Sequence, residues 1–263
     1  MDMKHLELYI GLFFILISCN KDSEPKFITQ NSNEIVKYVI NISNMRITDY
    51  SKYINDKLIE TTSFENTDTT IVRLTKNSEN KITYKRVFIV GNTNLAKLAI
   101  DSSYSKDGLY TAHLDYVYEN GYLIETTIDW NRFDDNPSSG QFYITRIIEN
   151  ENLKSSNEAY PGWPSGCTDC FDYNSTINKI DVIDFSNGIT GNISKNLIKH
   201  ASWHNGCPGG PSSSIACSDF KYELDNNGYI VKKTETYTPP YNMTLSDEVT
   251  RTVKTTIYEY NAR

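Results

Sequence analysis

The residues with the greatest chemical potential are four cysteines and two histidines within the stretch 155–217. Cys167 and Cys170 form a Cys-x-x-Cys pair, and Cys207 and Cys217 follow later in the chain. In an exported protein an even set of cysteines favours disulfides, because the compartment is oxidising. We therefore expect two bridges from the Cys167/Cys170 pair to Cys207 and Cys217, with the order of pairing left open.

A zinc site is the first alternative for the same residues. The ligand types and local spacings of a tetrahedral structural site are present in Cys167, Cys170, His204 and Cys207, and either Cys217 or His200 could replace one of them. A metal held there would also be the starting point for a metal-assisted hydrolase.

A redox or nucleophilic cysteine is the second alternative. A Cys-x-x-Cys pair becomes reactive when it opens a helix, since the helix N-terminus lowers the thiol pKa. Here the pair follows Pro161, Pro164 and Gly166 and precedes Phe171, with no helix signal. The sequence therefore disfavours thiol chemistry at this pair.

Three tryptophans, two of them close to Asn or Asp residues, could stack on sugars. They are Trp130, Trp163 and Trp203. Their rings are ligand-binding candidates, and the alternative is that they pack the interior. The nearby carboxylates Asp129, Asp134 and Asp135 match no calcium-loop spacing, and such Asp/Asn clusters are typical of turns. His113 lies in an alternating run and is expected to point outward.

The N-terminus carries a different kind of chemistry. Residues 8–17 form an apolar run too short to span a bilayer but suited to a secretion signal. The run ends in Leu16-Ile17-Ser18-Cys19, which resembles the lipobox of bacterial lipoproteins. That resemblance implies a signal peptide over 1–18, cleavage after Ser18, lipid on Cys19 and a polar tether over 19–26.

Composition limits the possible partners and the fold class. The 263 residues include 19 Tyr and carry a net charge of -7, and a body of that sign repels nucleic acid. Tyrosine suits pleated, half-exposed surfaces and favours strands. Since no strands alternate with ten-residue helical patterns, a parallel α/β fold is disfavoured.

Hairpin signals recur along the body. Asn120-Gly121 and Asn227-Gly228 each stand between alternating runs, as a type I′ turn requires, and Asp107-Gly108 is a shorter version. The string Leu-Ile-Glu-Thr-Thr occurs at 58–62 and again at 123–127, which indicates a recurring hairpin unit. The lysines of Ile230–Lys233 are expected to protect a sheet edge.

These patterns predict a mainly β fold: an antiparallel meander or open barrel-like sheet over 27–263. It is expected to be a single domain that contains a cysteine-rich, loop-rich insert over 155–217, where Ser, Asn, Gly and Pro interrupt the strand rhythm.

The Tyr-rich hairpins resemble the tyrosine–aspartate repeats of Rhs-type proteins. More closely, the chain resembles an uncharacterised family of Bacteroidota-type lipoproteins with a porin-like β-meander domain. The stretches 194–199, 220–232 and 257–260 carry this likeness. The resemblance implies a place in the cell envelope and brings no catalytic residues, while the four extra cysteines depart from it. Lys21, Asp22 and Glu24 resemble the acidic signal that directs such lipoproteins to the outer surface.

We therefore expect an exported lipoprotein, anchored to the outer membrane by lipid and displayed at the surface. Its expected role is non-enzymatic, in binding a ligand or in envelope structure, without a cofactor. One alternative is a glycan-binding accessory of polysaccharide capture, and the other is the metal-assisted hydrolase. A glycan or a protein is the expected ligand, and nucleic acid is excluded.

Overall fold

A computed structural model of the chain describes residues 26–43, 46–91, 95–105, 108–132, 140–159, 168–179, 189–192, 194–205, 214–241 and 248–262. The predicted signal peptide and Cys19 lie outside these residues, as do Trp163, Cys167 and Cys207. The same holds for Asp134 and Asp135. Within the described ranges, no helix has the length and apolar character needed to cross a membrane.

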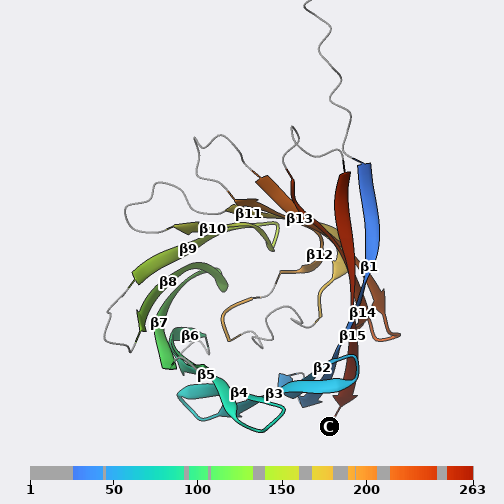
Figure 1. Ribbon diagram of the computed structural model, residues 1–263. Helices are drawn as coiled ribbons and strands as arrows, with labels where there is room; N and C mark the ends of the chain where they lie inside the picture. The colour runs from blue at the N-terminus through green and yellow to red at the C-terminus, as the bar shows by residue number, and fades with distance from the viewer. Residues whose placement is uncertain are drawn as a thin grey trace, which may run out of the picture.

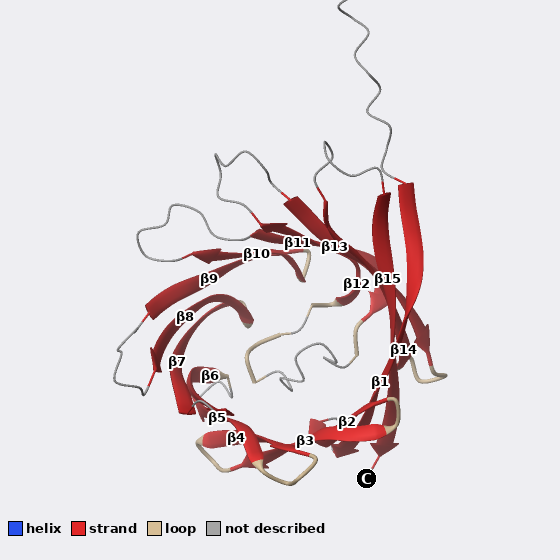
Figure 2. Cartoon of the chain, viewed as in Figure 1, coloured by secondary structure: helices blue, strands red, loops and turns tan. Residues whose placement is uncertain are grey.

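The described residues form fifteen strands that close into one barrel (Figure 1). The strands are β1 (Lys26–Ser43), β2 (Arg46–Ile54), β3 (Lys57–Asn66), β4 (Thr70–Asn77), β5 (Ile82–Val90), β6 (Ala96–Ser105), β7 (Gly108–Glu119), β8 (Tyr122–Arg132), β9 (Gly140–Glu149), β10 (Asn152–Ala159), β11 (Thr168–Ile177), β12 (Asn196–Asn205), β13 (Ser214–Leu224), β14 (Ile230–Tyr241) and β15 (Glu248–Ala262). Figure 2 shows this strand wall with loops and turns between its members.

The predicted meander is confirmed, and the alternative of an open sheet is wrong. Each strand pairs antiparallel with its neighbour in sequence, and β1 pairs with β15 in parallel. An odd number of strands in a meander leaves the first and last strands running in the same direction, so closure has to be parallel. Closure removes both sheet edges.

Much of the predicted insert is barrel wall. The strands β11, β12 and the start of β13 all lie within 155–217 and pair on both sides. The prediction of a loop-rich insert is therefore wrong for these residues. The polar sequence of β11 gives little sign of a strand. Its pairing with two neighbouring strands, and not its own β propensity, holds it in the barrel wall. The lysines of Ile230–Lys233 likewise occupy an interior strand, not an edge.

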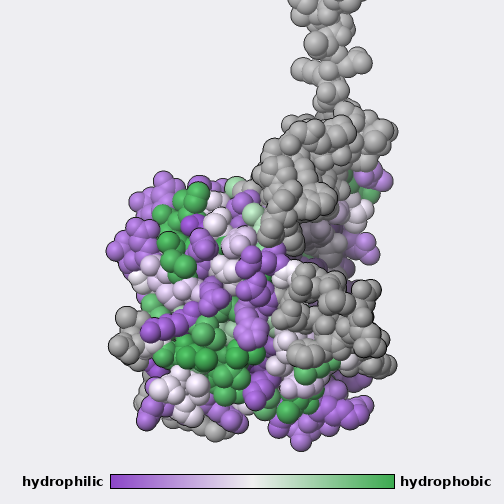
Figure 3. Space-filling model, turned by 90° about the vertical axis from the view of Figure 1, so that its left-hand side faces the viewer, coloured by the Kyte–Doolittle hydropathy of each residue, from purple (hydrophilic) through white to green (hydrophobic). Residues whose placement is uncertain are grey.

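The barrel interior combines apolar and aromatic clusters with a few charged side chains, and its outer face carries ion pairs beside exposed apolar residues such as Ile147 and Ile177. One interior cluster contains Ile40, Tyr50 and Tyr258, each at most 3% exposed. Between neighbouring strands on the opposite face, ion pairs join Lys37 to Glu259 (3.7 Å), Lys232 to Glu223 (2.7 Å) and His200 to Asp219 (2.8 Å). On the face seen in Figure 3, hydrophilic residues interrupt the apolar areas.

The predicted hairpin unit is confirmed. Asn120 and Gly121 have φ values of 51° and 82°, as a type I′ turn requires. Leu58 pairs with Tyr53 and Leu123 pairs with Tyr118, and in both hairpins the next rung skips one residue. Each copy of the pentapeptide therefore contains a β-bulge at the same position.

Between β11 and β12, the described residues 189–192, 194 and 195 lie inside the ring of strands in Figure 1. We call these residues the inner segment. Ala96 N donates to Ile189 O (2.8 Å), and Asn192 N donates to Gly121 O (2.7 Å). The Ile189 side chain is 5% exposed and joins a cluster with Phe88 and Leu114.

Gly191 allows this close approach to the wall. Its φ is 106°, and a Cβ at this position would lie 2.8 Å from the carbonyl oxygen of Gly121. Any other residue would be strained in this backbone conformation and would also push the segment off the wall. The inner segment thus divides the lumen at a fixed depth.

Candidate functional site

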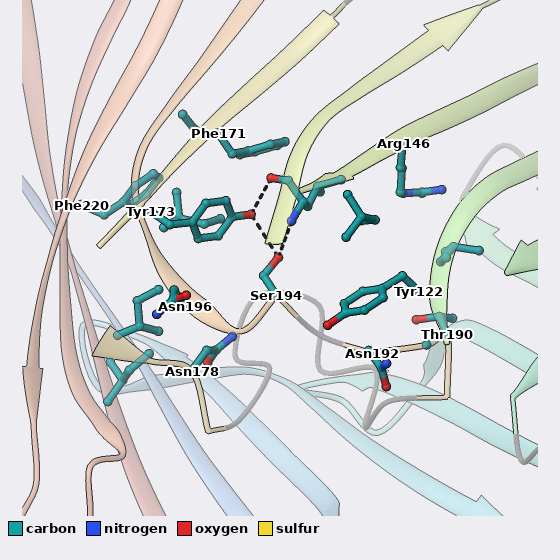
Figure 4. A pocket seen from close by; sticks show the side chains of 18 of the residues that line it. Tyr122, Arg146, Phe171, Tyr173, Asn178, Thr190, Asn192, Ser194, Asn196 and Phe220 are labelled. Carbon is teal, nitrogen blue, oxygen red and sulfur yellow. Dashed lines mark hydrogen bonds between the residues drawn. The ribbon is translucent and has the colours of Figure 1, made fainter. Parts of the chain in front are cut away.

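A cavity of about 370 Å³ lies between the inner segment and the wall formed by β8 to β14 (Figure 4). Its lining is mainly apolar and aromatic, with a few polar groups. A concave, mostly apolar space with a small number of converging polar side chains is the usual form of a small-molecule site. A second cavity of about 370 Å³ lies beyond Ile189, against Ile47, Phe64 and Ile71.

Aromatic side chains from several strands face the first cavity. Phe171 and Tyr173 are two positions apart in β11, and Phe220 and Tyr222 are two apart in β13. Because alternate residues of a strand point to the same face, each pair places both rings in the lumen. Trp203 of β12 and Tyr122 of β8 add to this lining.

Hydrogen bonds fix the floor of the cavity to its wall (Figure 4). Leu153 N donates to Ser194 Oγ (3.1 Å), and Tyr173 Oη donates to Leu153 O (2.8 Å) while lying 3.0 Å from the same Ser194 oxygen. Burial raises the pKa of both Tyr173 and Tyr222, so both phenols are neutral at physiological pH. The cavity is therefore largely preformed and can accept a ligand without ordering its own walls.

Two cationic side chains line the cavity. Arg146 Nη1 donates to Thr126 Oγ1 at 2.9 Å. Lys233 Nζ lies 5.7 Å from the centre of the Phe220 ring. Burial lowers the pKa of Lys233, while the nearby carboxylate of Glu235 favours its charged form. The cavity thus places positive charge against an otherwise apolar lining.

Asn178 adds a polar group with unused hydrogen-bonding capacity. Asn178 is one of the residues that line the cavity, and its Oδ1 atom is buried with no hydrogen-bond donor within the described part of the chain. Its backbone N–H donates to Lys195 O (2.8 Å), which holds the residue in place. A buried acceptor without a donor costs free energy, and a ligand that carries a donor would recover it.

The predicted site residues have mixed outcomes. Trp203 lines the cavity, and its role as a ligand-binding residue stays a prediction. Trp130 lies in β8, and Trp163 falls outside the described residues. His113 is exposed on β7, which confirms its predicted orientation, and Asp129 pairs with it in the ladder.

Cys170 and Cys217 are free thiols. Both pair with Ser202 of β12, from opposite sides, so they lie two strands apart. Adjacent strands are about 4.8 Å apart, which puts these cysteines roughly 9–10 Å from each other, beyond disulfide reach. The prediction that Cys170 and Cys217 form disulfides is therefore wrong, and a bridge between Cys167 and Cys207 lies outside the described residues.

The described residues also bring no three potential ligands together as a metal site would require. His200, a candidate replacement ligand, has its Nδ1 2.8 Å from the carboxylate of Asp219. The zinc alternative built on Cys167, Cys170, His204 and Cys207 depends on side chains beyond the described ones.

The sequence reasoning missed Arg146, Asn178 and Lys233. Arg146 and Lys233 stand in strands whose side chains alternate between the two faces of the barrel wall. The sequence does not show whether a single charged side chain points inward or outward until the register of the strand is known. Asn178 stands in a connection whose path into the barrel carries no local signal.

The sequence matches no protein-family model and no curated protein. Among solved structures, the barrel is similar to a porin-like protein from Bacteroides uniformis, at 16% sequence identity and a TM-score of 0.50. The match covers 79% of this chain and 82% of that chain. The chain therefore shares its β-barrel fold with a porin-like protein.

Proposed function

We propose that this chain is a non-enzymatic protein of the cell envelope that holds a small, mostly apolar ligand inside its barrel. The observation that carries the proposal is the cavity of about 370 Å³, which is lined by aromatic side chains and closed on one side by the inner segment. A rigid apolar cavity gains binding free energy from the ligand surface removed from water.

The distribution of charge supports binding inside the barrel. A membrane barrel presents an apolar band outward and polar groups inward. Here the core tyrosines and isoleucines face inward, and ion pairs such as Lys37–Glu259 and Lys232–Glu223 face outward. Arg86, Asp101 and Arg146 also face inward, so it is the mainly apolar wall of the cavity, and not the lumen as a whole, that favours an apolar guest.

The lipid anchor on Cys19 belongs to the same proposal. The tether over 19–26 leads into β1, so the anchor would lie at the barrel end where β1 begins. Connections that follow odd-numbered strands lie at the opposite end, and these include the β7–β8 turn, the β9–β10 turn and the inner segment. Lipid on Cys19 would therefore hold the ligand-binding half away from the membrane surface.

A cavity-filling variant tests the function. The neutral apolar fluorophore N-phenyl-1-naphthylamine should bind the wild-type barrel and be displaced by decanol. Ala201→Phe should abolish this binding, because Ala201 is 2% exposed and lines the cavity. The adjacent His200→Phe should bind normally, since His200 pairs with Asp219 on the outer face.

Circular dichroism would confirm that both variants are folded. Failure of the wild-type protein to bind either compound would refute the function. Equal binding by a folded Ala201→Phe variant would do the same.

A glycan is the second candidate ligand, because Trp203 lines the cavity together with the amides of Asn178, Asn192 and Asn196. Aromatic faces beside amide groups suit sugar rings. A glycan array would test it, and any hit should be lost in Trp203→Ala.

A further inference from the structure

We propose that the ligand is an acidic amphiphile, an apolar body with one anionic group, and that Lys233 is the residue that holds the anion. This inference rests on the proposed function and names the chemistry of the ligand. It comes from the contrast between two neighbouring lysines on β14.

Lys232 and Lys233 differ in the face of the barrel that they occupy. Lys232 Nζ lies 2.7 Å from Glu223 Oε1 on β13, which is an exposed ion pair across the ladder. Lys233 lines the cavity, and its Nζ lies over the Phe220 ring. Within the described residues, no carboxylate lies within ion-pair distance of Lys233. A cation held inside a mainly apolar cavity with no carboxylate in contact is costly, so it marks a place for an anion.

Glu235 does not take that place. It stands two residues further along β14, and its Oε1 accepts a hydrogen bond from Ser218 Oγ at 2.7 Å. Ser218 is fully buried, so this contact holds the carboxylate against β13. In the ladder Glu235 stands opposite Lys254 of β15, which offers it a second positive neighbour.

Three arginines of the interior have partners from the chain itself. Arg86 donates to both carboxylate oxygens of Asp101, at 2.5 and 2.6 Å. Arg73 Nη2 donates to the hydroxyl of Tyr50 at 2.8 Å. Arg146, across the cavity from Phe220 in Figure 4, donates to Thr126. Lys233 thus differs from these arginines, since a ligand must supply its oxygen partner.

Asn178 provides an independent observation in the same cavity. Among the described residues its buried Oδ1 atom has no donor, so the polar end of the ligand should also offer a hydroxyl or amide hydrogen. The aromatic rings of Phe171, Tyr173 and Phe220 would surround the apolar body. A ligand with an anionic, hydrogen-bonding end and an apolar body matches all of these side chains.

Decanoate and decanol make a matched pair of probes, because they differ in the charged group and share the alkyl chain. Each is titrated against bound N-phenyl-1-naphthylamine in the wild-type protein, Lys233→Met, Lys233→Arg and the control Lys232→Met. The wild-type protein should bind decanoate about tenfold more tightly than decanol. Lys233→Met should bind the two equally, whereas Lys233→Arg and Lys232→Met should keep the preference for decanoate.

The outcomes separate the two proposals. Equal affinity of the wild-type protein for decanol and decanoate would overturn the inference and leave the proposed function standing. A preference for decanoate that survives in Lys233→Met would do the same. If neither compound displaced the fluorophore, the proposed function itself would fail.

Discussion

Two regions of the barrel interior solve the problem of a buried cation in different ways. On the β5–β6 side, Arg86 donates to both oxygens of Asp101, and the side chains are 23% and 17% exposed. On the β13–β14 side, Lys233 has the Phe220 ring and an open cavity. In the first region the chain itself supplies the counter-charge, and in the second the cation faces a cavity that a ligand could fill.

The difference separates a charge that stabilises the fold from one that we propose to bind a ligand. Burial opposes the charge on Arg86, but the Asp101 carboxylate more than offsets this and raises the pKa of the guanidinium. For Lys233 burial prevails, and the pKa is lowered. Breaking the first arrangement should cost stability, while removing the second charge should increase it.

The largest effect is expected at the β5–β6 pair. Asp101→Leu removes the carboxylate and leaves the Arg86 charge partly buried without its partner, which should cost roughly 3 kcal/mol of unfolding free energy. Urea denaturation measures it. The double variant Arg86→Met/Asp101→Leu is the control, because it removes both charges and should recover most of the loss. A double variant as unstable as the single one would show that packing, not charge, governs this region.

A smaller loss is expected where the inner segment packs against the wall. Ile189→Ala removes methyl groups from the cluster with Phe88 and Leu114, and should destabilise the protein by about 2 kcal/mol. The matched control is Ile177→Ala, because Ile177 is 61% exposed and should change stability by less than about 0.5 kcal/mol. Equal losses in the two variants would mean that the inner segment does not divide the lumen as described.

The smallest effect has the opposite sign. Lys233→Met should stabilise the ligand-free protein by about 1 kcal/mol at neutral pH, since it removes an unpaired charge from an apolar cavity. The control Lys232→Met should be nearly neutral, because it loses only an exposed ion pair. A destabilised Lys233→Met would place that side chain among the structural cations such as Arg86.

The pH dependence of this last effect follows from the lowered pKa of Lys233. Between its folded and unfolded pKa values the unfolded chain binds more protons, so the stability of the wild-type protein rises with pH there. The advantage of Lys233→Met should therefore be full below the folded pKa and shrink as pH rises through it. Melting curves over alkaline pH measure this change, and an advantage that grew with pH would contradict the assignment.

The sequence by itself determined the strand-rich body and its hairpins. Asn120-Gly121 forms the predicted turn with positive φ at both residues, whereas the prediction of the same turn at Asn227-Gly228 is wrong, because only Gly228 has positive φ. Local chemistry of this kind acts within a few residues, so it can be read without knowing the fold.

Tertiary structure decided which face each strand presents. Of the two copies of Leu-Ile-Glu-Thr-Thr, the first buries its last threonine, Thr62, and the second buries the preceding one, Thr126. The same string, in the same hairpin register, therefore shows opposite faces to the lumen, because the surrounding strands and not the string decide which of two alternating faces points inward. Lys232 and Lys233 obey the same rule, and only the closed barrel reveals which of them lines the cavity.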